Sequence, residues 1–139
     1  MLMHCQTQHS ARAYADYLNS TDPRHACWLA EYASTGAPIG YATTCPPDLP
    51  VPLQGGDVEL KRIYVLSRFH GSGAGKRLSD TVLAFARGLQ APRLLLGTYQ
   101  DNQRAVAFYK REGFTQIGTR QFQVGHQVFD DIVMGMALA

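Results

Sequence analysis

Three alternating glycines, Gly71, Gly73 and Gly75, separate a strand-like run from an amphipathic helix pattern. The run, residues 60–66, contains branched and aromatic side chains typical of strands, and apolar residues recur at helical spacing after Gly75. Glycine accepts positive φ and lets another group approach the backbone closely. A strand, such a loop and a helix N-terminus together present several free N–H groups to an anion. The segment therefore predicts an anion site, and the expected anion is a pyrophosphate.

Two common phosphate-binding motifs do not fit this loop. A Walker A motif requires glycine where His70 stands and Ser or Thr where Arg77 stands. The dinucleotide fingerprint G-x-G-x-x-G requires its last glycine where the chain has Lys76. The sequence thus argues against both a P-loop nucleotide site and a Rossmann dinucleotide site.

Composition narrows the remaining possibilities. The chain has 139 residues, 45% hydrophobic and 17% charged, which predicts one globular domain spanning residues 1–139. A net charge of +2, with no basic cluster interleaved with aromatics, argues against nucleic acid as a partner. No apolar run is long enough to span a membrane, and the N-terminus lacks the apolar segment of a signal peptide. Three scattered cysteines indicate a reduced, cytoplasmic setting. His4, Cys5 and His9 lack the number and spacing of metal ligands, so no metal is expected.

Hydrophobic periodicity predicts an α/β domain with a mixed sheet, because hairpins bracket a central β-α-β unit. Asn102 is expected to cap one helix and Gly113 to end it. The segment 45–56, with four prolines and two glycines, is expected to be a loop. Helices are expected at residues 7–19, 75–89 and 102–111, and strands at 26–32, 39–44, 58–66, 93–98, 114–124 and 127–136.

Three segments resemble motifs of the GNAT acetyltransferases, which move an acetyl group from acetyl-CoA to an amine. The loop from His70 to Gly75 is similar to the family's pyrophosphate motif. The pattern Asn102, Ala105, Phe108, Tyr109, Gly113-Phe114 is similar to its second cofactor motif, and residues 59–65 resemble its central strand. The likeness covers roughly residues 27–138. Within the superfamily the chain resembles the PaiA-like spermidine/spermine branch, through residues 59–62, Phe122, Gly125, Asp130-Asp131 and Met134.

This resemblance implies a splayed mixed sheet flanked by helices, with acetyl-CoA as co-substrate. The pantetheine arm is expected to pair with the backbone around Ile63 and Val65, while the side chains there serve the core. The full set of expected cofactor-binding residues is Ile63, Tyr64, Val65, His70, Gly71, Ser72, Gly73, Ala74, Gly75, Lys76, Arg77, Asn102, Ala105, Phe108 and Tyr109. His70 replaces the family's usual Arg or Gln, which predicts that cofactor affinity depends on pH.

The resemblance also assigns two catalytic roles. Glu59 matches a glutamate that acts as general base, directly or through water, in several members. Tyr109 matches a tyrosine beside the CoA sulfur that protonates the leaving thiolate or donates a hydrogen bond to it. Plain structural roles stay open for both: Glu59 as a surface partner of Lys61 or Arg62, and Tyr109 as a core ring.

The expected reaction is direct attack of a primary amine on acetyl-CoA. The acceptor is expected to be a small molecule, with a polyamine as one candidate and Asp130 and Asp131 as candidate contacts. A protein or peptide amine and a non-catalytic acetyl-CoA-binding protein remain alternatives. Because the family usually begins with a strand and a helix before the helix placed at 7–19, the first strand is expected to be missing. The apolar edge left at residues 26–31, including Trp28, then predicts a homodimer or higher oligomer. The alternative is that residues 1–5 form a short substitute strand and the chain is monomeric.

Overall fold

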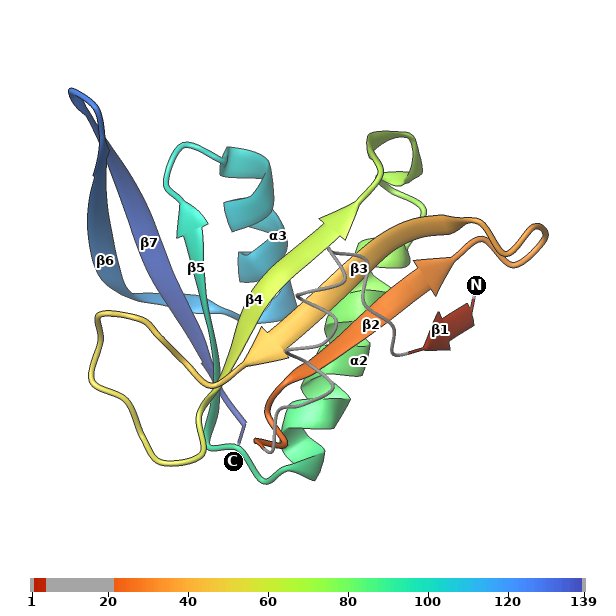
Figure 1. Cartoon of the computed structure of the whole chain (residues 1–139), viewed down its shortest axis with the longest axis horizontal. Helices are drawn as coiled ribbons and strands as arrows, with labels where there is room; N and C mark the ends of the chain where they lie inside the picture. The colour runs from red at the N-terminus through yellow and green to blue at the C-terminus, as the bar shows by residue number, and fades with distance from the viewer. Residues whose placement is uncertain (1, 5–21, 139) are drawn as a thin grey trace.

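The computed structural model describes residues 2–4 and 22–138 and shows a mixed α/β arrangement: an open seven-stranded sheet with two helices in the described part of the chain (Figure 1). The helix expected at residues 7–19 lies outside the described residues. The strand order is β1-β2-β3-β4-β5-β7-β6. The elements are β1 (Leu2–His4), β2 (Ala26–Glu31), β3 (Pro38–Cys45), β4 (Val58–Val65), the 3-10 turn η1 (Ser67–Phe69), α2 (Ala74–Gly88), β5 (Arg93–Tyr99), α3 (Gln103–Glu112), β6 (Thr115–Val124) and β7 (Gln127–Ala137).

Local signals set the element bounds. The Asn102 side chain accepts a hydrogen bond from the Ala105 N–H at 3.2 Å and so caps α3, while Gly113 ends the helix at φ 107°. Gly73, at φ 91°, precedes the first residue of α2. Each expected strand is present within about two residues of its predicted limits, which is the usual precision of such boundaries.

The expectation that the first strand is missing is wrong. Residues of β1 pair antiparallel with β2, from Leu2 opposite Glu31 to His4 opposite Leu29. Backbone hydrogen bonding needs only a short extended segment, and β1 lies within residues 1–5, where the alternative placed a short substitute strand. The homodimer prediction assumed a bare edge from residue 26 to residue 31, so β1 removes part of its basis.

The sheet is divided between β4 and β5. These two strands are parallel and pair at only two positions, Val58 with Leu94 and Glu59 with Leu95. Beyond Glu59 they diverge, whereas β5 is paired with β7 along its whole length (Figure 1). The sheet is therefore splayed, with one half formed by β1–β4 and the other by β5, β7 and β6.

A β-bulge in β4 keeps one face of that strand in the core. Thr43 pairs with Arg62 and Thr44 with Leu60, so Lys61 is an extra residue without a partner in β3. Val58 and Leu60 before the bulge, and Ile63 and Val65 after it, all belong to the core cluster. Without the bulge, strict alternation would place the second pair on the opposite face. The bulge therefore exposes Lys61 and Arg62 together.

The main core lies on the face of the sheet covered by α2 and α3. Leu78 and Val82 of α2 have no exposed surface, and Val106 and Tyr109 of α3 pack against the same cluster. The loop at residues 46–57 covers part of the opposite face, where Leu49 and Val51 pack with Leu95 and Val133. We call the face that carries this loop the loop face.

A buried ion pair fixes the end of this loop. Arg93 Nη2 lies 2.6 Å from Asp57 Oδ2, and the Asp57 side chain has no exposed surface. We expect Arg93→Ala to lower the free energy of unfolding by about 3–5 kcal/mol, because it leaves a buried carboxylate without its cation. Urea denaturation measures this change.

Asp80→Ala is the matched control, since it breaks the exposed Lys76–Asp80 pair, whose side chains are 64% and 56% exposed. It should cost less than about 1 kcal/mol. Equal losses in the two variants would contradict a special role for the buried pair.

Candidate active site

A cleft of about 500 Å³ lies between β4 and α3. It lies on the side of β4 where that strand separates from β5, and we call this separation of the two strands the split. Both predicted cofactor motifs contribute to its walls, although about thirty residues separate them in the chain. The residues lining it are Ile63, Tyr64, Val65, Phe69, His70, Gly71, Gly73, Gly75, Lys76, Asn102, Arg104, Ala105, Phe108, Tyr109 and Arg111. Folding therefore brings together twelve of the fifteen expected cofactor-binding residues.

The other three expected residues do not line the cleft. Ala74, the first residue of α2, is fully buried, and Arg77 is exposed on the same helix. The Ser72 hydroxyl accepts a hydrogen bond from the Ala74 N–H at 3.3 Å. Their side chains thus serve the loop and helix N-terminus, or face solvent, in this structure.

The glycine loop has the backbone that its sequence predicted. Gly71 and Gly73 have φ of 82° and 91°, and a Cβ at either would meet no atom within 4 Å. Gly75 is different, because a Cβ there would lie 3.6 Å from the Phe108 ring of α3. The first two glycines therefore provide an open left-handed backbone at the start of α2, whereas a Cβ at Gly75 would make ordinary contact with α3.

His70 contributes to the loop through a hydrogen bond. Its Nε2 lies 2.8 Å from the carbonyl oxygen of Val65, the last residue of β4. This contact links the glycine loop to the strand that forms the other wall of the cleft.

Positive charge gathers around the cleft, but one lysine is already paired. Lys76 Nζ lies 3.5 Å from Glu112 Oε2 and 3.5 Å from Asp80 Oδ1. Glu112, followed by Asp80, raises the pKa of Lys76. Arg104 and Arg111 line the cleft from α3 and were not expected from the sequence. They lie four residues before and three residues after Phe108, so helix periodicity could have placed them on its face.

Tyr109 lines the cleft while its ring packs in the core. The ring centroid lies 5.6 Å from that of Phe108 and 5.8 Å from that of Phe114, both in edge-to-face geometry. Burial raises the pKa of Tyr109 to about 12. The phenol is therefore neutral at physiological pH and available as a hydrogen-bond donor. The structural and functional roles proposed for this side chain are compatible.

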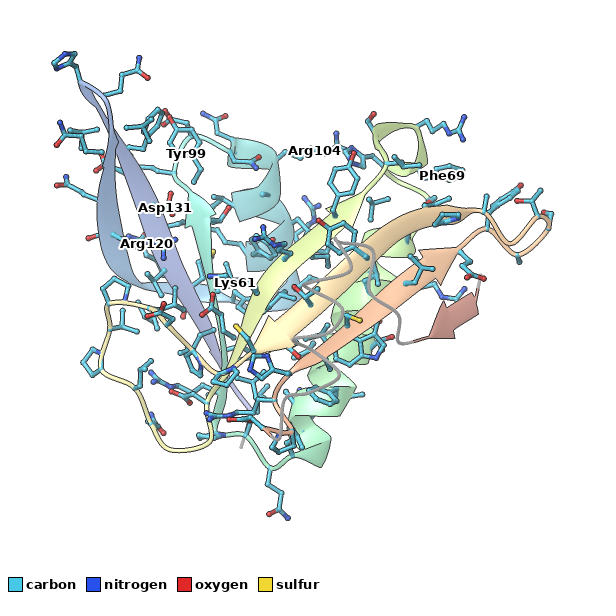
Figure 2. All side chains as sticks on the ribbon, in the orientation of Figure 1. Lys61, Phe69, Tyr99, Arg104, Arg120 and Asp131 are labelled. Carbon is cyan, nitrogen blue, oxygen red and sulfur yellow. The ribbon has the colours of Figure 1, made fainter. Side chains whose placement is uncertain are left out.

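Glu59 does not line the cleft. It is 3% exposed and lies at the narrow end of the split, where β4 and β5 make their last pair. Its Oε1 accepts a hydrogen bond from the Asp48 N–H at 2.9 Å, and its Oε2 lies 3.8 Å from Lys61 Nζ. Figure 2 shows Lys61 beside the split, near the point where the strands diverge. Burial, followed by the charge of Glu59, raises the pKa of neighbouring Cys45 to about 11.

Asp131, one of the two candidate acceptor contacts, is buried and paired within the fold, whereas Asp130 is half-buried. Asp131 is 7% exposed, and its Oδ2 lies 2.7 Å from Arg120 Nη2 on the neighbouring strand (Figure 2). Arg120 also reaches β5, because a Cβ on Gly97 would lie 3.2 Å from the same nitrogen. Asp131 is thus neutralised by a partner within the fold.

Two kinds of site have no counterpart in the described residues. Residues 2–4 and 22–138 contain no group of three or more His, Cys, Asp or Glu side chains arranged to hold a metal ion. Cys5 and His9 lie outside these residues. No helix in the same part of the chain is long and apolar enough to cross a membrane.

The chain thus combines a splayed mixed α/β sheet with a cleft lined by β4, the glycine loop and α3. The chain belongs to the GNAT acetyltransferase family, whose model, Acetyltransferase (GNAT) family, matches residues 2–114. An uncharacterized N-acetyltransferase of Mycobacterium tuberculosis strain H37Rv is 41% identical over 125 residues, covering 90% of this chain and 74% of that protein.

Solved structures show the same fold. A GNAT family acetyltransferase from Elizabethkingia anophelis, with acetyl-CoA bound, has a TM-score of 0.72 at 21% identity, covering 99% of this chain and 97% of that one. The ribosomal-protein-alanine N-acetyltransferase from Brucella melitensis has a TM-score of 0.74 at 22% identity, covering 99% and 100%. At these identities the likeness concerns the fold.

The glycine loop generates a prediction about binding. Acetyl-CoA or CoA at a hundredfold excess over its Kd should stabilise the protein by about 2.7 kcal/mol. Gly73→Asp should abolish the resulting rise in Tm, because it adds a side chain and a negative charge at an open, left-handed position of the loop. Differential scanning fluorimetry measures both effects.

Gly125→Asp is the control, since Gly125 also has positive φ and open space around it but lies in the β6–β7 turn. It should keep the ligand-induced rise in Tm. A retained rise in Gly73→Asp, or no rise in the unmodified protein, would contradict the assignment of the loop.

Proposed function

We propose that this chain transfers the acetyl group of acetyl-CoA to the primary amine of a small molecule. The observation that carries the proposal is the cleft that joins both cofactor motifs along an unpaired edge of β4. Family membership supports N-acetyl transfer, and the acceptor is our inference. We further propose that residues 1–139 are one acetyltransferase domain.

The cleft fits the shape and chemistry of acetyl-CoA. β4 makes no ladder pair with β5 after Glu59 in the described residues, so its backbone can pair with the amides of an extended pantetheine arm. The loop of Gly71 and Gly73 presents the N-terminus of α2 to the pyrophosphate, and Arg104 and Arg111 add positive charge nearby.

Different groups of the chain are proposed to take different roles in the reaction. When bound, acetyl-CoA supplies the thioester that the acceptor amine attacks directly. We propose that the N–H groups of β4 around Ile63 and Val65, which lie beyond its last ladder pair with β5, polarise the thioester carbonyl. Glu59 is the proposed base, and its burial favours relay through a water over direct contact with the amine.

Tyr109 acts on the sulfur side of the reaction. A phenol with its pKa raised to about 12 is a weaker acid than an ordinary thiol of pKa about 8.5, so full proton transfer to the sulfur is unfavourable. We therefore propose that Tyr109 stabilises the departing thiolate mainly as a hydrogen-bond donor.

We expect Tyr109→Phe to lower kcat by about tenfold to a hundredfold while the KM for acetyl-CoA changes little, because the phenol acts only as the sulfur leaves. Since the pKa is raised, the neutral donor persists as pH rises. The unmodified enzyme should thus show no decline in kcat caused by Tyr109 from about pH 8 to about pH 10. Initial rates of thiol release across this range test both points. Equal losses in kcat and in acetyl-CoA affinity would indicate a packing role.

The acceptor is the least determined part of the proposal. A polyamine, as in the PaiA-like branch, favours a narrow acidic site, yet Asp131 is paired with Arg120 and Glu59 lies beside Lys61. The described residues therefore give the polyamine less support than they give a small monoamine. A peptide amine remains the alternative acceptor.

A panel of amines separates these acceptors. We expect small monoamines to give a higher kcat/KM than spermidine or an N-terminal peptide, measured by acetyl-CoA-dependent thiol release. A preference for spermidine would restore the polyamine assignment, and a preference for the peptide would favour the alternative. No turnover with any amine, despite acetyl-CoA binding, would favour a non-catalytic binding protein. Cytoplasmic location and a homodimer remain predictions of the sequence.

A further inference from the structure

The loop at residues 46–57 connects β3 to β4 by a long path over the loop face rather than by a tight turn (Figure 1). Leu49 is 7% exposed and packs with Leu95 and Val133 on the other half of the splayed sheet. Val51 packs beside β6, since a Cβ on Gly118 would lie 2.6 Å from its Cγ1. The loop therefore spans the two halves of the sheet at the narrow end of the split.

The far end of the loop is held by a polar network. Arg93 pairs with Asp57 and also donates to the carbonyl oxygen of Pro52 at 2.9 Å. Asp57 Oδ2 in turn accepts a hydrogen bond from the Gln54 N–H at 2.8 Å. Prolines at positions 46, 47, 50 and 52 restrict the backbone between these anchors. The loop is thus fixed by apolar packing near its middle and by ion pairing near its end.

One backbone group of this anchored loop touches the proposed base. The Asp48 N–H donates to Glu59 Oε1 at 2.9 Å, immediately before the buried Leu49. The second carboxylate oxygen, Oε2, lies 3.8 Å from Lys61 Nζ, whose side chain is 43% exposed. One oxygen of Glu59 is therefore fixed by the loop, and the other lies toward a side chain that reaches solvent.

A purely structural explanation accounts for only part of this arrangement. A buried carboxylate needs hydrogen-bond partners, and the Asp48 N–H provides one. Burying a carboxylate at this position costs free energy that an apolar side chain would avoid. The Glu59 carboxyl group nevertheless lies on the last residue of β4 that pairs with β5, where the split begins.

We propose that the Asp48 N–H, held in place by the packed loop, positions Glu59 for catalysis with Oε2 toward the split. This inference rests on the proposed role of Glu59 as base. The acceptor nitrogen gives its proton to a water, and that water delivers a proton to Oε2. The carboxylate becomes a neutral carboxyl group and later returns the proton to solvent. Asp48 is a positioning residue, because it acts through Glu59.

Removing a single N–H tests the proposal. Asp48→Pro deletes the donor, and Asp48→Ala keeps it while removing the side chain. We expect Asp48→Pro to lower kcat by about tenfold or more without changing the KM for acetyl-CoA, since a misplaced catalytic group costs rate rather than cofactor binding. A loss of the same size in Asp48→Ala would overturn the proposal, because it would assign the effect to the side chain.

Leu53→Pro controls for the insertion of a proline into this loop. Leu53 is 47% exposed, and its N–H donates no hydrogen bond among those found in residues 2–4 and 22–138. This variant should keep the kcat of the unmodified enzyme. A kcat loss in Leu53→Pro that matches the loss in Asp48→Pro would attribute the effect to the loop backbone in general and overturn the proposal.

A double-mutant cycle with Glu59→Gln separates positioning from stability. If Asp48 acts through Glu59, Asp48→Pro should cause little further loss of kcat in the Glu59→Gln background. Full additivity of the two losses would overturn the positioning role. An unchanged kcat in Glu59→Gln alone would instead remove Glu59 as base, which is a failure of the proposed mechanism and is distinguishable from the first outcome.

A second variant covers the case in which Asp48→Pro does not fold. Val51→Ala keeps every N–H and loosens the packing of the loop against β6 and against the cluster of Leu95 and Val133. We expect a smaller fall in kcat, about threefold, with the acetyl-CoA-induced rise in Tm retained. An unchanged kcat in a folded, loosened Val51→Ala protein would contradict the proposal.

Discussion

The arrangement of the molecule depends on how briefly β4 and β5 are paired. Two residue pairs, at Val58 and Glu59, hold the parallel strands together, and the strands then separate. A parallel pair leaves its backbone groups unsatisfied where it ends, so something must pair with them or water must reach them. The cleft lies along this edge, and α3 with the cofactor motif on its surface forms the other wall. Strand separation therefore creates the cleft and leaves backbone groups of β4 that water or a ligand can satisfy.

The bulge at Lys61 determines which side chains face each side of β4. One extra residue lets Val58, Leu60, Ile63 and Val65 all contribute to the core, although their spacing breaks strict alternation. Lys61, the extra residue, lies two positions after Glu59, and its Nζ is 3.8 Å from Glu59 Oε2. The bulge that adjusts the packing of the core therefore adjoins the proposed base.

Charge around the site is largely balanced within the fold. Lys76 pairs with Glu112 and Asp80, and Arg120 pairs with Asp131. Arg104 and Arg111 line the cleft beyond these pairs and suit the phosphates of a nucleotide-containing ligand. The arginines of the cleft and the Glu59–Lys61 pair thus lie in different places along β4. This arrangement suits the proposal that an anionic co-substrate binds in the cleft and that Glu59 takes part in proton transfer.

Sequence alone determined the local elements and the cofactor loop. Gly73 and Gly113 are where left-handed backbone was expected, and Asn102 caps its helix as predicted, because these features depend on a few neighbouring residues. Most of the expected cofactor residues line the cleft. Each motif is short and continuous, so its residues stay together once the fold has brought the two motifs to the same cleft. Arg104 and Arg111 escaped notice, although their helical spacing from Phe108 was already in the sequence.

Tertiary structure decided what depends on contacts between distant residues. The bulge at Lys61 follows from the pairing of β4 with β3, and β1 at the sheet edge follows from pairing with β2. Neither strand register is encoded by local propensity. The environment of Glu59 is a tertiary result as well, because its partner Asp48 reaches it only after the loop packs on Leu95 and Val133. The sequence could name Glu59 as a candidate, but only the folded chain shows one of its oxygens held by a backbone N–H and the other beside Lys61, because long-range packing places those groups.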